Sequence, residues 1–381
     1  MKAGDSASMT VVSLAAYEAA TKDGLSPQEA AIQLLEKVEI RKFKDVLSLF
    51  ASDREVRELL VNGLCANDAG RSRMSVDKKV RGWLAGKYQP TAREDLLELC
   101  FVLHLNTEDA DAFLTMTGEE GLHWRDPREL VYAYALERGM SYREAQGLLE
   151  RVMPEEACAD ETAQAASFTP LIRQEMKQCG TEEELREFLS RAAGRLGRLH
   201  NSAYRQFTAM LKVLEKPESY VLKSERRYTI REIVQEYLDR KLPSVREGRT
   251  LEEKRRSILA DWPDEIVLSR MKNRRMDVTR KVLILLFLAT DGGEEPQEEW
   301  VDEDWEQEPP ADDADVTFRS SYMRINQMLA ECGYRMLDPR NAFDWLVLYC
   351  MRVEDEGAGM DGLNERLTHV LEALFPPQAE G

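Results

Sequence analysis

Apolar residues recur at intervals of three and four along most of the chain, which is the period of one buried face of an α-helix. One such stripe, which predicts either one long helix or two helices in line, comprises Leu185, Phe188, Leu189, Ala192, Leu196, Leu199, Ala203, Phe207, Met210 and Leu214. Segments with the alternating period of β-strands, bounded by turn pairs, are missing. The pattern therefore predicts an all-α fold.

Helix starts are marked by a Ser or Thr that is followed three residues later by a Glu. In this arrangement the two side chains satisfy N–H groups of the first turn that have no partner within the helix. The pairs are Ser26/Glu29, Thr91/Glu94, Ser141/Glu144, Thr181/Glu184, Thr229/Glu232 and Thr250/Glu253. Each pair predicts a helix that begins just after its Ser or Thr.

One helical unit is present twice in our interpretation of the sequence. The copies lie at about residues 75–137 and 265–352. Their front parts align at an offset of 187, which pairs Arg93 with Arg280, and their back parts align at an offset of 215. The second copy therefore carries an insertion of 28 residues. A duplicated helical unit favours a binding protein over an enzyme.

The net charge of −18 is distributed unevenly. Residues 291–315 hold thirteen acids and no base, and Pro296, Pro309 and Pro310 interrupt any regular element. Without this segment the net charge is about −5. Because such a composition buries too little apolar surface to offset the entropy of ordering, we expect a disordered acidic insertion inside the second copy.

These features predict four parts of the chain. They are a leader with one helix after Ser26 (1–37), a first helical unit (38–152), a linker with a helical connector (153–217), and a second helical unit (218–376) that contains the acidic insertion. The linker itself is expected at 154–166, where the sequence is polar and rich in alanine.

The stretch from Ser75 to Thr91 has the pattern of a short helix, a turn at Gly86-Lys87, and a Pro-Thr start to a longer helix. It resembles the recognition helix and following turn of the Xre, or lambda-repressor-like, helix-turn-helix family. The resemblance covers about residues 75–115 and, weakly, 265–290. It implies a helix-turn-helix-like corner in each copy and DNA contacts on that corner.

Two features depart from the family's pattern. Gly63 to Met74, ahead of the first corner, is rich in Asn, Asp, Gly and Arg, and it predicts an irregular segment. The second copy has Asn273 in place of Gly86 and lacks the proline. We expect Asn273 to adopt the left-handed conformation of the turn, because Asn tolerates that conformation.

Basic side chains concentrate at both predicted corners, where the family presents its DNA-facing surface. Lys and Arg there would neutralise phosphates and release counterions, which gives affinity with little sequence information. The candidate nucleic-acid-binding residues are Arg71, Arg73, Ser75, Lys78, Lys79, Arg81, Lys87, Gln89 and Arg93 in the first copy and Arg270, Lys272, Asn273, Arg274, Arg275, Arg280 and Lys281 in the second. Among them, Ser75, Lys78, Lys79 and Gln89 are candidates to reach base edges or the backbone. The alternative is a solvated basic face that offsets acids elsewhere.

Recognisable patterns for catalysis or metal binding are missing from the sequence. No G-x-S-x-G, P-loop, H-E-x-x-H or G-x-G-x-x-G occurs in a suitable context, and the six cysteines include no CxxC pair. We therefore expect no enzymatic activity, no metal and no cofactor, with reduced and mostly buried thiols. The pairs Arg125/Glu129 and Arg340/Asp344 each place an acid four residues after an arginine, which predicts an ion pair at the start of a helix.

The leading hypothesis is a cytoplasmic DNA-binding regulator that contacts phosphates through both basic corners. The first alternative is a protein-interaction adaptor of a signalling or defence system, in which the basic corners meet an acidic protein partner. The second is an RNA-binding accessory protein. No apolar run is long enough for a membrane span, so we expect no membrane partner. The oligomeric state stays open, a homodimer included.

Overall fold

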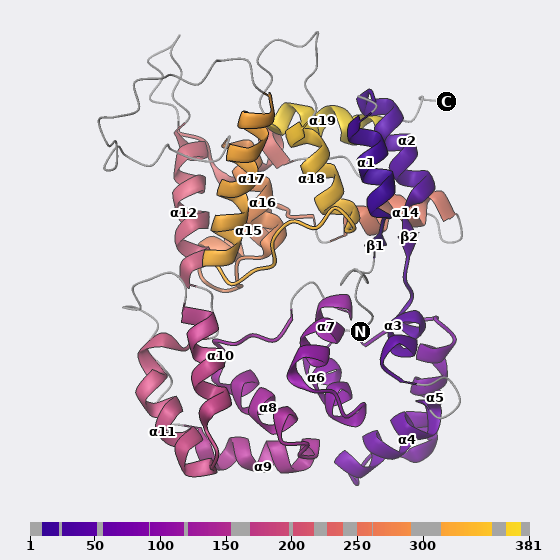
Figure 1. Ribbon diagram of the computed structural model, residues 1–381, viewed down its shortest axis with the longest axis vertical. Helices are drawn as coiled ribbons and strands as arrows, with labels where there is room; N and C mark the ends of the chain where they lie inside the picture. The colour runs from indigo at the N-terminus through magenta and orange to yellow at the C-terminus, as the bar shows by residue number, and fades with distance from the viewer. Residues whose placement is uncertain are drawn as a thin grey trace. The chain divides into compact units, whose positions relative to one another are not determined.

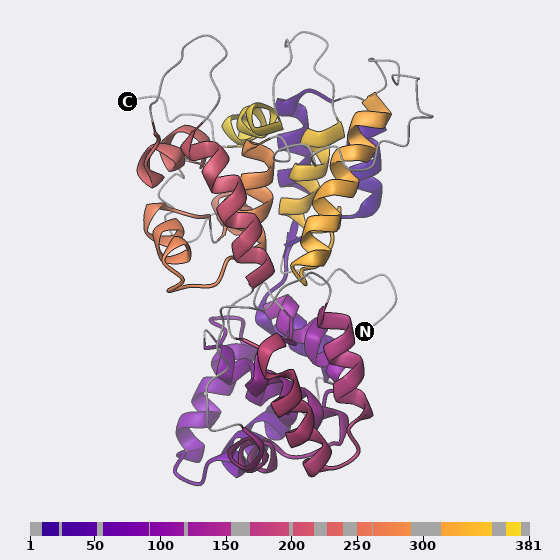
Figure 2. The same ribbon diagram turned by 90° about the vertical axis from the view of Figure 1, so that its left-hand side faces the viewer.

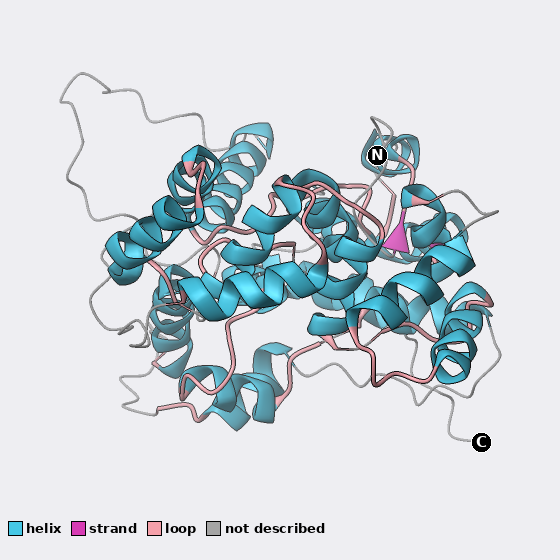
Figure 3. Cartoon of the chain, turned by 90° about the horizontal axis from the view of Figure 1, so that it is seen from below, coloured by secondary structure: helices cyan, strands magenta, loops and turns pink. Residues whose placement is uncertain are grey.

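The computed structural model describes residues 10–22, 25–51, 56–90, 92–117, 121–153, 168–197, 201–216, 227–238, 250–260, 262–290, 314–352 and 363–374. Almost all of these residues lie in helices or in the turns between them (Figures 1 and 3). The two strands in this part of the chain, β1 (Thr10–Val11) and β2 (Glu39–Ile40), have two residues each and pair with one another. The predicted all-α fold is confirmed. Among the helices described, none combines the length and the apolar character that crossing a membrane requires.

The chain divides into two compact units. Unit 1 comprises residues 1–11 and 40–198, and unit 2 comprises residues 12–39 and 199–381. This grouping differs from the predicted parts in two places. Most of the predicted leader (1–37) belongs to unit 2, and the predicted connector (153–217) is shared between the two units.

Unit 1 is built from helices α3 to α11. Their bounds are α3 (Phe43–Phe50), α4 (Val56–Asn67), α5 (Arg73–Leu84), α6 (Arg93–Val102), α7 (Thr107–Thr117), α8 (Pro127–Glu137), α9 (Tyr142–Val152), α10 (Phe168–Gln178) and α11 (Glu182–Ala192), followed by the 3-10 turn η1 (Ala193–Arg195). Helix α5 contacts α3 and α4, and α6 contacts α4, α7 and α9. The aromatic centre of this core is Phe43, whose ring meets Trp83 edge-on at 5.8 Å and Phe113 at 6.2 Å.

Unit 2 is built from helices of both ends of the chain. Their bounds are α1 (Leu14–Lys22), α2 (Pro27–Lys37), α12 (Asn201–Glu215), α13 (Ile230–Ile233), the π-helical turn η2 (Val234–Leu238), α14 (Thr250–Ile258), α15 (Glu265–Lys272), α16 (Arg280–Ala289), α17 (Ala314–Glu331), α18 (Ala342–Arg352) and α19 (Leu363–Leu374). Helix α16 is buried along its whole length and contacts α12, α17 and α19.

The N-terminal helices α1 and α2 complete the core of unit 2. They lie beside α18 and α19 in Figure 1 and again in the turned view of Figure 2. The Tyr17 ring meets Trp345 edge-on at 6.2 Å, and Trp345 stacks on Tyr349 at 5.4 Å. The Val12 amide donates to the Arg340 carbonyl at 2.8 Å. The helices of the predicted leader are therefore an integral part of this unit, because their apolar residues are buried in its core.

Four of the six predicted capping pairs form reciprocal caps, at Ser26, Ser141, Thr181 and Thr229. Thr91 lies outside the described residues, and α14 begins at Thr250 itself. The stripe from Leu185 to Leu214 is divided between α11 and α12, so it is not one long helix.

Three other sequence predictions concern segments that link helices. The prediction that residues 63–74 are irregular is wrong at both ends of this segment, because α4 continues to Asn67 and α5 begins at Arg73. The linker at 154–166 lies outside the described residues. So does the acidic insertion at 291–315, except for its last two residues, which begin α17.

Candidate nucleic-acid interface

The short helix of the first predicted corner is α5, which is preceded by α4 and a five-residue turn at 68–72. Val76, Val80 and Trp83 are buried at intervals of four and three, and they hold α5 against the core of unit 1. In the turn, the Asp68 carboxylate accepts a hydrogen bond from the Gly70 amide at 2.9 Å. Two consecutive helices are thus fixed against each other, with the opposite face of α5 turned to solvent.

The end of α5 is a left-handed turn at Gly86, which has φ of 66°. The Gly86 amide donates to the Trp83 carbonyl at 2.9 Å, and the Lys87 amide donates to the Gly82 carbonyl at 3.0 Å. These bonds satisfy carbonyls of the last helical turn, as in a Schellman motif. The Tyr88 ring folds back onto Gly82, where a Cβ would lie 2.2 Å from its Cζ atom.

The corresponding turn in unit 2 follows α15, and here the sequence prediction is wrong by one residue. Asn273 has φ of −88°, while the left-handed residue is Arg274, with φ of 53°. The Arg274 amide donates to the Met271 carbonyl at 2.9 Å, and the Arg275 amide donates to the Arg270 carbonyl at 2.8 Å. The turn after α15 is therefore hydrogen-bonded like that after α5, although no glycine is present.

Four predicted binding residues of unit 1 carry an ion pair within the unit. Arg71 lies 2.7 Å from the buried Glu98, Lys79 lies 3.0 Å from Asp95, and Arg81 lies 3.1 Å from Asp77. The fourth residue with an ion pair is Arg93. The Asp77 carboxylate also accepts a hydrogen bond from the Arg57 guanidinium at 2.7 Å. This bond holds the pKa of Asp77 below its ordinary value. Their charges are thus largely balanced by neighbouring carboxylates.

No ion pair within 4 Å is formed by the other predicted residues of unit 1 in the described part of the chain, although the charge of Arg73 helps to lower the pKa of Asp77. Arg73, Ser75, Lys78 and Lys87 are exposed, and Gln89 is half-buried. Three of them, Arg73, Ser75 and Lys78, lie on α5. Met74, between Arg73 and Ser75, is 80% exposed. The solvent-facing side of α5 is therefore basic over its first two turns.

Arg93 is half-buried and is bound by acceptors inside unit 1. Its Nε and Nη2 atoms lie 2.6 and 2.7 Å from the two carboxylate oxygens of Glu129, and Nη2 also donates to the Gly121 carbonyl. Burial would raise the pKa of Glu129, but the Arg93 bonds, with the His123 amide, outweigh it and hold the pKa below its ordinary value. Arg93 stays a predicted binding residue, but a phosphate would have to compete with these internal acceptors for its guanidinium.

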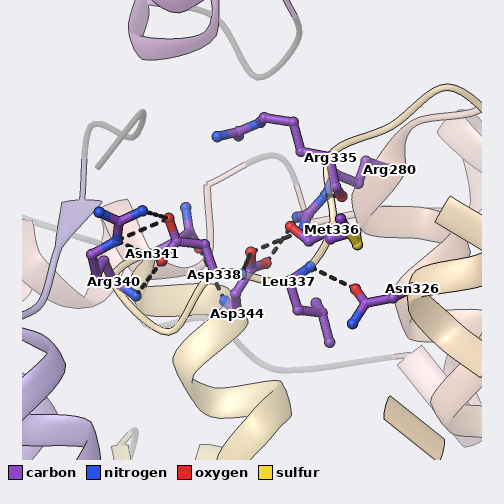
Figure 4. A network of polar contacts seen from close by, with 9 residues as sticks. All are labelled: Arg280, Asn326, Arg335, Met336, Leu337, Asp338, Arg340, Asn341 and Asp344. Carbon is purple, nitrogen blue, oxygen red and sulfur yellow. Dashed lines mark hydrogen bonds and ion pairs between the residues drawn. The ribbon is translucent and has the colours of Figure 1, made fainter. Parts of the chain in front are cut away.

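Arg280 and Lys281 of unit 2 are buried. Arg280 donates to both carboxylate oxygens of Asp344 at 2.8 Å and to the carbonyls of Arg335 and Met336 (Figure 4). The Lys281 ammonium donates to the Ala260 carbonyl. The first turn of α16 therefore faces the interior, and neither residue lies on the exposed basic surface that the sequence predicts.

The remaining candidates of unit 2 are divided. Lys272 lies 2.6 Å from Glu215, and the exposed Asn273 donates to the Ser269 carbonyl of its own helix. Arg274 donates to Asn201 and lies over the Tyr204 ring at 4.6 Å. Arg270 and Arg275 are exposed, with no carboxylate partner among the described residues. This corner thus offers fewer free cations than that of unit 1.

The two units contain the same polar network. In both, an arginine at the start of one helix binds an acid in the first turn of another, and a side chain on the preceding helix accepts an amide from the connecting loop. The corresponding residues are Arg93, Glu129, Asp111 and Leu122 in unit 1 and Arg280, Asp344, Asn326 and Leu337 in unit 2, where the accepting bonds are 2.9 and 2.8 Å. On sequence alone, Glu129 and Asp344 are each paired with the arginine four residues earlier. In the structure each of them binds an arginine of another helix.

Sequence analysis missed two basic residues that the fold brings to the end of α5. Lys42 and Lys44, at the start of α3, are both exposed. A Cβ at Gly86 would lie 3.1 Å from the Cδ atom of Lys42 and 3.5 Å from that of Lys44. Their charge is visible in the sequence, but their proximity to a turn more than forty positions away is not.

The cysteines in the described part of the chain are mostly buried. Cys100, Cys179, Cys332 and Cys350 are buried, and burial raises the pKa of Cys332 to about 12. The described residues contain no cluster of metal-ligating side chains. No protein-family model, curated protein or solved structure matches this chain.

Proposed function

We propose that unit 1 binds double-stranded DNA through the exposed face of α5, chiefly by contacts to phosphates. The observation that carries the proposal is the set of exposed cations on this face, Arg73 and Lys78, which form no ion pair within 4 Å among the described residues. Helix α5 also follows another helix after a short turn, which is the arrangement that places a helix in the major groove. The resemblance to the lambda-repressor-like family adds to this support.

The start of α5 favours an anion. Among the described contacts, the Ser72 side chain makes no capping hydrogen bond, and the first turn contains no acid. The amides there carry the positive end of the helix dipole, and an arginine, Arg73, follows at once. By contrast, α9 and α11 begin with a side-chain cap and a glutamate. A phosphate at the start of α5 would therefore meet both amide groups and a cation.

The proposal assigns DNA binding to unit 1 rather than to both units. In unit 2, Lys272 is paired with Glu215, and Arg280 is paired with Asp344. Charges that already have a carboxylate partner release few counterions when they meet a phosphate, since the partner must be displaced. Unit 2 is thus expected to add little to DNA affinity.

The test is a charge reversal in each unit. R73E/K78E is compared with the matched variant R270E/R275E, and the binding of a labelled duplex is followed by fluorescence anisotropy in rising salt. The unit 1 variant should lose most of the affinity, while the unit 2 variant should stay within about twofold of the parent. Equal loss in both variants, or none in either, would contradict the proposal. Competition with single-stranded DNA and RNA shows which nucleic acid is preferred.

The adaptor alternative is favoured by one observation in unit 2. Helix α17 exposes Met323 (68%) and Tyr322 (36%), and Phe318 stacks on Tyr322 at 5.8 Å. Neighbouring apolar side chains at one helix surface are typical of protein interfaces. A Y322A/M323A variant that loses a protein partner recovered with the tagged chain, while R73E/K78E retains it, would support the adaptor.

A further inference from the structure

The end of α5 at Gly86 lies where a duplex bound by its first turns would continue. Helix α5 has 12 residues and is therefore about 18 Å long. The major groove of B-DNA is about 12 Å wide. If α5 enters the major groove by its first turns, as a recognition helix does, its other end reaches the edge of the groove. The sugar-phosphate backbone runs along this edge.

A helix end of this kind is by itself unfavourable for a phosphate. The last carbonyls carry the negative end of the helix dipole, which repels an anion. At α5 this effect is offset by three exposed lysines. Lys87 follows the turn. Lys42 and Lys44, at the start of α3, lie within contact distance of a Cβ at Gly86. None of the three has a carboxylate partner among the described residues.

The two lysines of α3 are held in place by the core. Phe43, between them, is buried and meets Trp83 of α5 edge-on at 5.8 Å. The Lys42 amide donates to the Asp45 carboxylate at 2.7 Å, which caps the start of α3. Since Gly86 has no side chain, the stems of Lys42 and Lys44 can approach the turn closely. The Cδ atoms of both side chains thus lie beside the turn that ends α5.

We propose that Lys42, Lys44 and Lys87 form a second phosphate-binding surface, which contacts the backbone of the same duplex beyond the groove entered by α5. It supplies affinity without reading sequence, because a point charge on a flexible stem distinguishes no base. The inference rests on the proposed function. It adds that α3, a helix outside the resemblance to the helix-turn-helix family, is part of the DNA contact.

The test is the salt dependence of duplex binding by the full chain. A labelled duplex of about 20 base pairs is titrated between about 50 and 200 mM salt with the parent and with K42A/K44A. Each lost phosphate contact lowers the slope of log K against log salt by about 0.9, so the variant slope should be smaller by about 1.8. K42R/K44R keeps both charges and should keep the slope.

The control variant is R143A/R191A, which removes two exposed cations from α9 and α11 of the same unit. It should leave the slope unchanged; an equal decrease would mean that only net charge matters, and would overturn the inference. Circular dichroism shows whether each variant is folded, and K42Q/K44Q replaces K42A/K44A if the latter unfolds.

The two proposals fail in distinguishable ways. If R73E/K78E weakens duplex binding but K42A/K44A and K42Q/K44Q keep the parental slope, the second surface is refuted and the role of α5 stands. A loss of stability in K42A/K44A with an unchanged slope identifies the lysines as partners of the helix end only. If the parent chain binds no duplex, both proposals fall together.

Discussion

Arg280 and Asp344 form a buried bidentate ion pair in unit 2, with both N–O distances at 2.8 Å. The exposed fractions of the two side chains are 11% and 3%. Arg280 also donates to two loop carbonyls, and Asp344 accepts the Asp338 amide at 2.9 Å. The pair thus joins the starts of α16 and α18 to the loop between α17 and α18 (Figure 4).

Removing one member of this pair should destabilise unit 2 strongly. In D344A the Arg280 guanidinium stays buried without its counter-charge, and breaking a buried pair costs about 3 to 5 kcal/mol. Urea unfolding followed by circular dichroism measures the loss. R280M/D344L, which removes both charges, should recover part of the stability, and a double variant no more stable than D344A would contradict this account.

The ion pairs show what sequence reasoning can and cannot supply. Offsets of 187 and 215 align Arg93 with Arg280 and Glu129 with Asp344, so the residues of both networks can be marked from the sequence. Their partners cannot, because an acid four residues after an arginine suggests a pair within one helix. Tertiary packing instead brings an arginine of another helix to each acid. Arg93 and Arg280, two candidate binding residues, are therefore engaged by acids inside their units.

Glu129 makes the stability of unit 1 depend on pH. Its pKa is held below the ordinary value of 4.5, against the effect of burial, mainly by Arg93. A depressed pKa contributes stability that is present above the unfolded-state pKa and is lost as the pH falls through the folded-state pKa. The parent should therefore exceed E129Q in unfolding free energy at neutral pH, and the difference should shrink below pH 4.5.

Urea unfolding of the parent and E129Q across this pH range tests the prediction. Other acids with depressed pKa values, such as Glu175 beside Arg195, are common to both chains and cancel in the difference. A difference that grows towards acid pH would have the wrong sign and would exclude the assigned role of Glu129.

The left-handed turn at Gly86 should resist substitution. An alanine there must adopt φ near 66°, which costs about 1 to 2 kcal/mol, and its Cβ would press on Lys42. G86N should cost less, because Asn tolerates this conformation. Gly139, with φ of 62° and no atom within 4 Å of a Cβ, provides the control G139A, which has the strain without the crowding.

Urea unfolding and amide hydrogen exchange of α5 measure these costs. G86A should lose more stability than G139A, and faster exchange should be concentrated at the end of α5. Equal losses in the two variants would mean that contact with Lys42 adds nothing.

The basic corner itself was predictable only in part. Helical periodicity and the Gly-Lys turn indicate α5 and its end, and the exposed Arg73 and Lys78 stand where the pattern puts them. Arg71 and Lys79 were candidates on charge alone, and the structure gives each a carboxylate more than ten positions away in the chain. Lys42 and Lys44 reach the corner through the Phe43–Trp83 contact, for which the sequence has no local signal.

The cysteines should differ sharply in their reactivity in the folded chain. Burial raises the pKa of Cys350 to about 12 and also raises that of Cys100, so both thiols are protonated and out of reach of a reagent. Cys65 is half-buried on α4. Alkylation with iodoacetamide near pH 8, followed by peptide mass spectrometry, should therefore modify Cys65 well before Cys100 and Cys350. In denaturant the three should react at similar rates, and rapid labelling of Cys100 in the native chain would contradict the packing of α6 described above.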